Sequence, residues 1–309
     1  MLRNDPDGEG PYQFDFFVPH LSDINLRDQR ETMERPFFNL AKRKRLKPID
    51  YKSPDGDIWV KVEAIPAYGM ATIWDADILI WAASVLTEMK NAGKNDLPRT
   101  LIFHPHNLLK GIKRSTSGTD YERLRAGLDR LKTTVITTNI RAKGRKRYRK
   151  FGWIDQWTEE VEESTNRTKH MTITLSDWMY EGIIQDGGVL AIHPDYFLLT
   201  GGLERCLYRV ARKHVGRQNI PWFISLSTLY TKTGSSGTPK EFTRMIRKIA
   251  QEDSLPEYHL FLTTKNGAGE LSVGFSRRKA LRPVGRPALL QPPPSERKSV
   301  NSPRRRRSI

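Results

Sequence analysis

The sequence predicts an α+β fold of two tandem winged helix-turn-helix domains, followed by a disordered basic tail. The same order of predicted elements occurs twice: a helix, a short strand, two helices and a β-hairpin. That order is typical of a winged helix-turn-helix. From Arg278 onward the composition changes to Pro, Arg and Ser, and such a segment buries too little apolar surface to fold.

Four regions follow from these patterns. A length of 309 residues is enough for two domains. The N-terminal segment is polar and ends in a basic run from Lys42 to Lys47, so we expect it to be only partly ordered. The predicted ranges are 1–50 for this arm, 51–200 for the N-terminal winged-helix domain, 201–277 for the C-terminal winged-helix domain and 278–309 for the tail.

The first copy is expected to begin with a strand at residue 59. Its third helix begins at Thr119, which has the spacing of a capping box with Glu122, and Leu124, Leu128 and Leu131 give it an apolar face. The expected elements are a strand at 59–65, a helix at 73–91 capped by Thr72 and Asp75, a strand at 100–103, a helix at 105–112, the third helix, and a hairpin of strands 133–140 and 151–157. A strand at 171–175, a helix at 176–184 and a strand at 189–192 then belong to this domain or to a bridge.

The second copy contains the strongest helix-start signal in the chain. Thr238, Pro239 and Glu241 supply a capping Thr, a Pro at the first helical position and a Glu at the third. The core face of this helix is predicted to be Phe242, Met245, Ile246 and Ile249. The expected elements are a helix at 203–214, a strand at 222–224, a helix at 226–232, this third helix, and a hairpin of strands 258–264 and 271–275.

The charge balance predicts a polyanionic partner. The chain has 52 Lys and Arg against 35 Asp and Glu, a net charge of +17, and Lys and Arg near phosphates release condensed counterions. Composition alone leaves DNA, RNA and an anionic membrane open. No signal peptide or bilayer-length apolar run is visible, and the single cysteine, Cys206, excludes an intramolecular disulfide. We therefore expect a cytoplasmic protein, with Cys206 in its core and no membrane contact.

The third helix of the second copy is the main candidate for DNA contact. The second helix of a helix-turn-helix motif lies in the major groove. Here Lys240, Arg244 and Arg247 recur at i, i+4 and i+7, with Thr243 and Lys248 beside them. Arg and Lys reach guanine O6 and N7, or a phosphate. The alternative is an ordinary solvated helix face.

The corresponding helix of the first copy carries a more mixed pattern. Arg123, Arg125 and Arg130 are its candidate DNA contacts, and the small Gly127 would permit close approach, but Asp129 lies among them. This helix therefore either contacts DNA or faces a partner subunit.

A basic loop is predicted at the tip of the first hairpin. Residues 141–150 include seven Lys or Arg in ten. Within this loop Lys143, Arg145, Lys146 and Arg147 are expected to follow phosphates or to enter a minor groove. The alternative is a loop that is only solvated.

No catalytic residue, metal site or cofactor is expected. His104 and His106, with Tyr121 downstream, resemble the histidine pair and tyrosine of rolling-circle nicking enzymes. However, Pro105 removes a strand donor and no acidic cluster adjoins the pair. We interpret both histidines as surface or helix-start residues. A P-loop ATPase is not supported either, because the sequence has no G-x-x-x-x-G-K-[ST] run.

Many segments of the chain resemble the replication initiator protein A family of bacterial plasmids. The resemblance covers roughly residues 14–277. The segments that carry it are FFVPHLSDINLRDQRETMERPFFNLAKR (16–43), GMATIWDADILIWAASVL (69–86), GTDYERLRAGLDRLKTTVITTNI (118–140), FGWIDQW (151–157), TLSDWMYEGI (174–183), HPDYFLLTGGLERCLYRVARKHVGRQ (193–218) and KEFTRMIRKI (240–249).

The resemblance implies a replication initiator that binds repeated double-stranded DNA sites (iterons) at a plasmid origin. It implies melting of a nearby AT-rich region and recruitment of the host replication initiator and the replicative helicase, with no enzymatic activity. In related initiators the C-terminal winged helix makes the main base contacts, and the N-terminal one contacts DNA or forms a homodimer. The matching positions here are Lys240, Arg244, Arg247 and Lys248 for the first role, and Arg123, Arg125 and Arg130 for the second. A transcriptional repressor without an initiation role and a nicking enzyme remain the alternatives.

Overall fold

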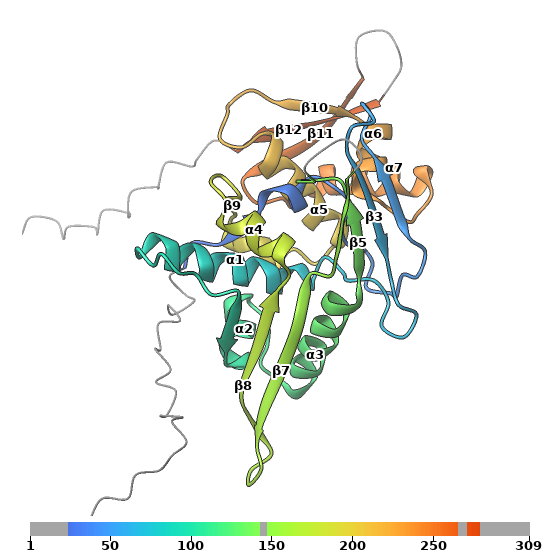
Figure 1. The fold of residues 1–309 in the computed structure, drawn as a ribbon. Coiled ribbons are helices and arrows are strands. Elements are labelled where there is room, and N and C mark those ends of the chain that lie inside the picture. Colours follow the sequence, from blue (N-terminus) through green and yellow to red (C-terminus); the bar gives the residue numbers. More distant parts are fainter. Residues whose placement is uncertain (1–23, 143–146, 265–270, 279–309) are drawn as a thin grey trace, which may run out of the picture. The chain divides into compact units, whose positions relative to one another are not determined.

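Two runs of elements with the same order make up most of the structure (Figure 1). The computed structural model describes residues 24–142, 147–264 and 271–278. The first run comprises α1 (Ala76–Asn91), β4 (Thr100–Phe103), α2 (Pro105–Gly111), α3 (Gly118–Thr133), β7 (Ile154–Glu162) and β8 (Arg167–Leu175). Its three strands form an antiparallel sheet in the order β4-β8-β7.

The second run repeats this order after residue 200. It comprises α5 (Gly202–His214), β10 (Trp222–Ser225), α6 (Leu226–Thr233), α7 (Pro239–Glu252), β11 (Tyr258–Thr264) and β12 (Leu271–Arg277). The sheet order is β10-β12-β11, again antiparallel. The described residues up to Arg277 belong to one compact unit of mixed α and β structure. The domain ranges derived from the sequence stay predictions, and residues 279–309 of the tail lie outside the described residues.

The hairpin predicted from strands 133–140 and 151–157 is wrong. Its first strand belongs to a separate four-stranded antiparallel sheet. Its strands are β2 (Ile49–Lys52), β3 (Trp59–Glu63), β5 (Val135–Thr138) and β6 (Arg149–Phe151), in the order β2-β3-β5-β6. The single strand expected at 151–157 is two strands in different sheets, because the chain turns at Gly152 and the Trp153 N–H donates to the Leu131 carbonyl at 3.1 Å. The basic loop therefore links β5 to β6, and the hairpin paired with β4 is β7–β8.

Short elements connect these runs to the N-terminal segment. Strand β1 (Arg27–Gln29) pairs with β9 (Val189–Ala191), more than 150 residues later in the chain. The 3-10 helix η1 (Arg30–Met33) follows β1, α4 (Asp177–Ile184) precedes β9, and η2 (Pro194–Leu198) leads into α5. The helix and strand expected near 176–184 and 189–192 are confirmed.

Local side-chain hydrogen bonds define where the helices begin. Helix α3 is capped by Ser117, whose hydroxyl accepts from the Asp120 N–H, so the start expected at Thr119 was two residues late. The predicted Thr238 start of α7 is confirmed, with a reciprocal capping box to Glu241. Thr72 forms a turn ahead of α1: its N–H and its hydroxyl donate to the Asp75 carboxylate at 2.8 and 2.9 Å.

Large aromatic side chains lie at the centre of the apolar core. Trp153 and Trp178 are fully buried, and Trp153 stacks on Phe38 with ring centroids 4.6 Å apart. The predicted core residues of α3 and the single cysteine are buried as expected (Leu124, Leu128, Leu131 and Cys206). Met245 of α7 was wrongly assigned to the core; its 39% exposure places it at the border of the buried face.

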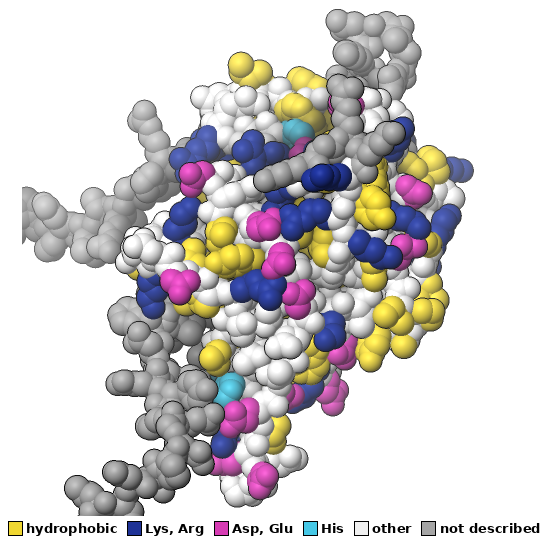
Figure 2. Space-filling view, viewed as in Figure 1, with side chains coloured by type: hydrophobic (Ala, Val, Ile, Leu, Met, Phe, Trp, Pro, Cys, Tyr) yellow, Lys and Arg dark blue, Asp and Glu magenta, His cyan; other side chains and the backbone are white. Residues whose placement is uncertain are grey.

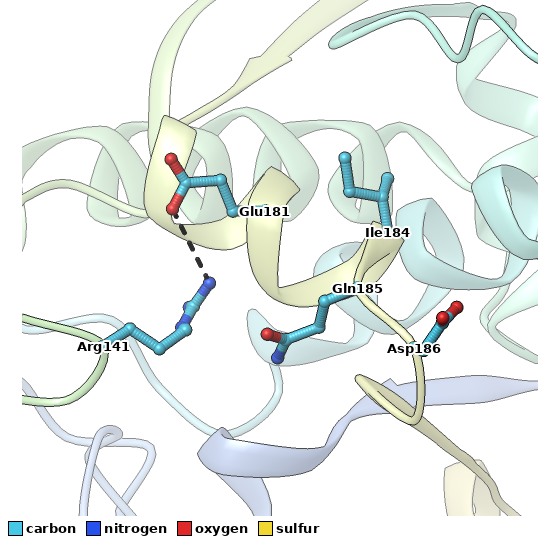
Figure 3. Close-up of a pocket in the computed structure, with 5 residues that line it drawn as sticks. All are labelled: Arg141, Glu181, Ile184, Gln185 and Asp186. Atoms are coloured by element: carbon cyan, nitrogen blue, oxygen red, sulfur yellow. Dashed lines mark ion pairs between the residues drawn. The ribbon is translucent and has the colours of Figure 1, made fainter.

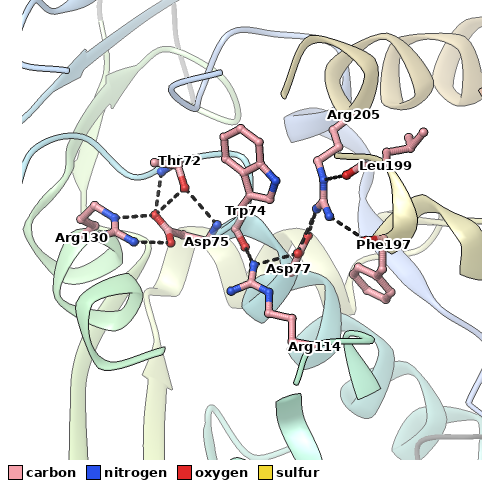
Figure 4. A network of polar contacts seen from close by, with 9 residues as sticks. All are labelled: Thr72, Trp74, Asp75, Asp77, Arg114, Arg130, Phe197, Leu199 and Arg205. Atoms are coloured by element: carbon pink, nitrogen blue, oxygen red, sulfur yellow. Dashed lines mark hydrogen bonds and ion pairs between the residues drawn. The ribbon is translucent and has the colours of Figure 1, made fainter. Parts of the chain in front are cut away.

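Asp77 of α1 is the centre of a buried ion network (Figure 4). The carboxylate is fully buried and accepts from Arg205 of α5 at 2.7 and 2.9 Å and from Arg114 at 3.0 Å. Arg205 also donates to the carbonyls of Leu199 and Phe197, at 2.8 and 3.0 Å. Each nitrogen of this guanidinium thus has a partner inside the protein, and the network joins the first run to the second.

Two further arginines of α5 repeat this arrangement one and two turns later. Arg209 pairs with the buried carboxylate of Asp28 in β1, at 2.6 Å, and Arg212 donates to the Ala191 carbonyl of β9. The three arginines, at i, i+4 and i+7, are 3, 3 and 8% exposed. Helix α5 therefore contacts the rest of the chain through charged groups on one stripe, and Gly202 at its start leaves no space for a Cβ against the Leu40 carbonyl.

We expect Asp77→Ala to destabilise the fold strongly. It would leave Arg205 buried without a counter-charge, and breaking a buried pair costs about 3–5 kcal/mol. Urea unfolding of the full chain measures the change, with Glu163→Ala at an exposed position as the control. A loss below about 1 kcal/mol for Asp77→Ala would show that the network does not hold α5 in place.

Glu34, directly after η1, is surrounded by cations from α5 and α6. Its carboxylate lies 2.8 Å from the Arg35 guanidinium, 3.2 Å from His214 Nε2 and 3.5 Å from Lys232 Nζ. Burial by itself raises the pKa of Glu34, but the hydrogen bond to His214 and the charges of Arg35, Lys232 and Lys213 outweigh it and lower the pKa to about 2. The folded state therefore favours the ionised carboxylate.

This shift predicts a specific loss of stability in acid. Since the pKa falls from its usual 4.5 to about 2 on folding, Glu34 stabilises the fold above its unfolded pKa and loses that effect as the pH drops through this interval. Glu34→Gln should be less stable than wild type at about pH 6, with a gap that narrows towards about pH 3. Urea unfolding across that range tests this, and a gap that widens in acid would contradict it.

Candidate nucleic-acid interface

Helix α7 presents a row of cations away from the core. Lys240, Arg244, Arg247 and Lys248 are all exposed, whereas Phe242 of the same helix is buried and packs on Tyr230 of α6, with ring centroids 5.2 Å apart. The amphipathic pattern therefore fixes the orientation of the helix. The predicted charged face is solvent-accessible over about two turns.

Most of the cations on α7 lack an internal counter-charge. Within the described residues, no ion pair within 4.0 Å joins Lys240, Arg244 or Arg247 to a carboxylate, and Lys248 has only the exposed Glu252 at 3.5 Å. The Thr243 hydroxyl donates to the Pro239 carbonyl at 2.8 Å, so this side chain offers a ligand only its oxygen lone pairs. The α7 face can thus neutralise an external anion without first breaking internal pairs.

The arginines of α3 are placed differently. Arg125 forms a two-point pair with Glu159 of β7, at 2.7 and 2.6 Å, and Arg130 forms another with Asp75, at 2.8 and 2.7 Å (Figure 4). Only Arg123 is largely exposed, and it lies 3.0 Å from Asp120. Two of the three candidate contacts on α3 therefore connect this helix to its neighbours.

The close approach expected at Gly127 occurs, but it is between helices. Gly127 is buried, and a Cβ there would lie 2.9 Å from an Asp75 oxygen and 3.5 Å from Ile78 of α1. The glycine allows α3 to pack directly on the start of α1. It therefore belongs to the core face of α3 and not to the outer face expected from the sequence.

The basic stretch between β5 and β6 is partly structural. Arg141 lies over the Trp178 ring at 4.1 Å and donates to the Trp178 carbonyl at 2.6 Å. It also lines an open pocket beside α4, 4.0 Å from Glu181 (Figure 3). Arg147 is exposed. The remaining predicted contacts, Lys143, Arg145 and Lys146, lie outside the described residues.

The hairpin that pairs with β4 is acidic, a feature that the sequence assignment missed. Strand β7 and the following turn include Glu159, Glu160, Glu162 and Glu163, against Arg167 and Lys169 on β8. Glu160 pairs with Lys169 at 3.5 Å, and Glu159 forms an ion pair with Arg125. An acidic excess repels phosphates, so this hairpin is unsuited to the role predicted for the basic loop.

The two histidines near residue 105 act as a helix start. His104 caps α2, and its Nδ1 accepts from the His106 N–H at 3.2 Å. Burial, followed by the nearby His106, lowers the pKa of His104. Among the described residues, no group of three or more His, Cys, Asp or Glu side chains is arranged to hold a metal ion, and none of the described helices is long and apolar enough to cross a membrane.

Two arginine variants on α3 should separate structural from exposed cations. Arg130→Ala leaves the 4%-exposed Asp75 carboxylate without its counter-charge, and we expect a loss of about 3 kcal/mol in the free energy of unfolding. Arg123→Ala, on the same helix, should change it by less than about 0.5 kcal/mol. Equal effects in urea unfolding would contradict the assignment of Arg130 to the core.

Two sequence comparisons match this chain to known proteins. The family described as Replication initiator protein A matches residues 27–260. A "Putative replication protein" of Wigglesworthia glossinidia brevipalpis is 33% identical over 249 residues, which cover 79% of this chain and 88% of that protein.

One solved structure shows a similar fold. A crystal structure of domains 2 and 3 of RctB has a TM-score of 0.55 at 14% identity, covering 78% of this chain and 94% of that one. A second structure of these domains has a TM-score of 0.48, also at 14% identity, and covers 78% and 95%. The family match over most of the chain and the 33% identical relative show that the chain belongs to the replication initiator protein A family.

Proposed function

We propose that this chain starts plasmid replication by binding repeated double-stranded DNA sites at an origin. The exposed and largely unpaired cationic face of α7 is the observation that carries the proposal. In this proposal the run from α5 to β12 is a winged helix-turn-helix, and α7 lies in the major groove. Arg244 and Arg247 contact guanine edges or phosphates, and Lys240 and Lys248 contact phosphates.

In this proposal the first run is also a winged helix-turn-helix, but it makes fewer contacts with DNA. On α3 only Arg123 is free of a two-point pair, since Arg125 and Arg130 hold β7 and α1. The acidic β7–β8 hairpin avoids phosphates. This part of the chain therefore orients the protein on DNA or forms a homodimer contact. It does not provide most of the affinity for DNA.

Origin opening in this proposal needs no catalytic residue or cofactor of this chain. Copies bound along repeated sites bend the duplex, and deformation energy concentrates in a nearby AT-rich segment. Tighter binding to the deformed DNA is sufficient to shift the equilibrium towards opening. The host replication initiator and the replicative helicase then act on the opened region.

The double variant Arg244→Ala, Arg247→Ala tests the proposal. Each good base contact contributes about 1–3 kcal/mol, so the variant should bind the repeats at least about 30-fold more weakly while keeping the wild-type circular dichroism spectrum. Footprinting on DNA flanking the gene that encodes this chain locates the repeats and measures the loss.

The matched control is Arg167→Ala, Lys169→Ala, which removes two exposed cations from the acidic β7–β8 hairpin. It should leave the footprint intact. Normal protection by a folded α7 double variant would overturn the assignment of α7. Protection of repeats without loss of the plasmid upon deletion of the gene would favour a transcriptional repressor instead of an initiator.

A further inference from the structure

The four-stranded sheet β2-β3-β5-β6 lies outside both repeated runs and has one exposed face. Its inner face is buried through residues such as Val60, Val62 and Ile136. The alternate residues point outward, as the two-residue period of a strand requires. Neither helix-turn-helix pattern uses this outer face, and it belongs to no site described above.

Side chains on the outer face fall into two adjacent rows that cross the strands. Lys52 lies opposite Trp59, and Trp59 contacts Tyr148, with ring centroids 6.3 Å apart. In the next row Asp50 lies opposite Lys61, Lys61 opposite Thr137, and Thr137 opposite Lys150. The rows are two residues apart along the strands, or about 7 Å at the usual rise per residue. A row with two aromatic rings and Lys52 thus runs alongside a row with two lysines and Asp50.

The aromatic row is open to solvent. Tyr148 is 63% exposed, and Trp59 is partly exposed. Large aromatic side chains ordinarily contribute to stability by burial, so two that contact each other on an outer sheet face are available to a ligand with flat rings. The side of the molecule that holds β3 and β5 in Figure 1 shows lysine or arginine, hydrophobic and acidic side chains interspersed in Figure 2.

The charges on this face favour an anionic ligand. Lys52 and Lys150 form no ion pair within 4.0 Å among the described residues, and Arg147 is exposed directly before Tyr148. The carboxylates on the face are Asp50 and Glu63, and Glu63 is already paired with Lys61 at 2.7 Å. A ligand with aromatic rings spaced along a phosphate backbone would stack on the aromatic side chains and place its phosphates near the lysines.

We propose that this outer face binds single-stranded DNA, with bases stacked on Trp59 and Tyr148 and phosphates near Lys52 and Lys150. Base stacking on exposed aromatic side chains requires unpaired bases, because bases in a duplex are already stacked on each other. The proposal goes beyond duplex recognition by α7. It gives the chain a surface for one strand of an opened duplex.

The test compares a 20-nucleotide oligo(dT) with an abasic oligonucleotide of the same length, using the full chain. Both ligands carry the same phosphates, so any cationic segment binds them alike, and only stacking distinguishes them. Fluorescence anisotropy should show that wild type prefers oligo(dT). Tyr148→Ala should weaken oligo(dT) binding at least about fivefold, as expected for one lost stacking contact, and leave the abasic affinity unchanged.

Four further variants keep the outcome interpretable. Trp59→Phe should retain most of the preference for bases, whereas Trp59→Ala should lose it, and Phe223→Ala, at an exposed aromatic on β10, should have no effect. The Arg244→Ala, Arg247→Ala protein should still prefer oligo(dT), so failure of duplex recognition and failure of this site are distinguishable. No preference for oligo(dT) in wild type, or an unchanged preference in Tyr148→Ala, would overturn the proposal.

Discussion

The ion pairs buried under α5 are the constraint on which the relation between the two runs depends. Arg205 and Arg209 are nearly inaccessible, and each has its charge matched by one carboxylate from the first half of the chain. A buried guanidinium without such a partner is very costly. Helix α5 can therefore take only a position in which Asp77 and Asp28 face it, and this position sets where β10, α6 and α7 begin.

The same rule explains which arginines are free to act outside the protein. A guanidinium held by two short contacts to a buried carboxylate, as in Arg130 with Asp75, already has its charge matched and its Nε–Nη2 edge occupied. Arg244 and Arg247 lie on a helix whose acidic residues are at its two ends, and neither guanidinium has an ion pair within 4.0 Å among the described residues. Cationic excess alone therefore does not locate a DNA-binding surface, whereas the distribution of internal carboxylates does.

Three surfaces of the chain have different electrostatic character. The α7 face is cationic, the β7–β8 hairpin is acidic, and the outer face of the β2-β3-β5-β6 sheet combines lysines with two aromatic rings. In the proposed function α7 contacts duplex DNA, and the outer sheet face is proposed to bind single-stranded DNA. Separate surfaces of different charge would allow both contacts without competition for one site.

The sequence by itself determined the local features: the order of helices in both runs, the Thr238 start of α7 and the buried leucines of α3. These features depend on residues within one or two turns of each other, and periodicity and capping report them directly. The family was also evident from segments spread along the chain. Only the tertiary structure decided that residues 151 and 154 belong to different sheets, that the arginines of α5 are buried, and that Trp59 meets Tyr148. Each of these depends on contacts between residues far apart in sequence, and a one-dimensional pattern does not encode which carboxylate, or which ring, a side chain will meet.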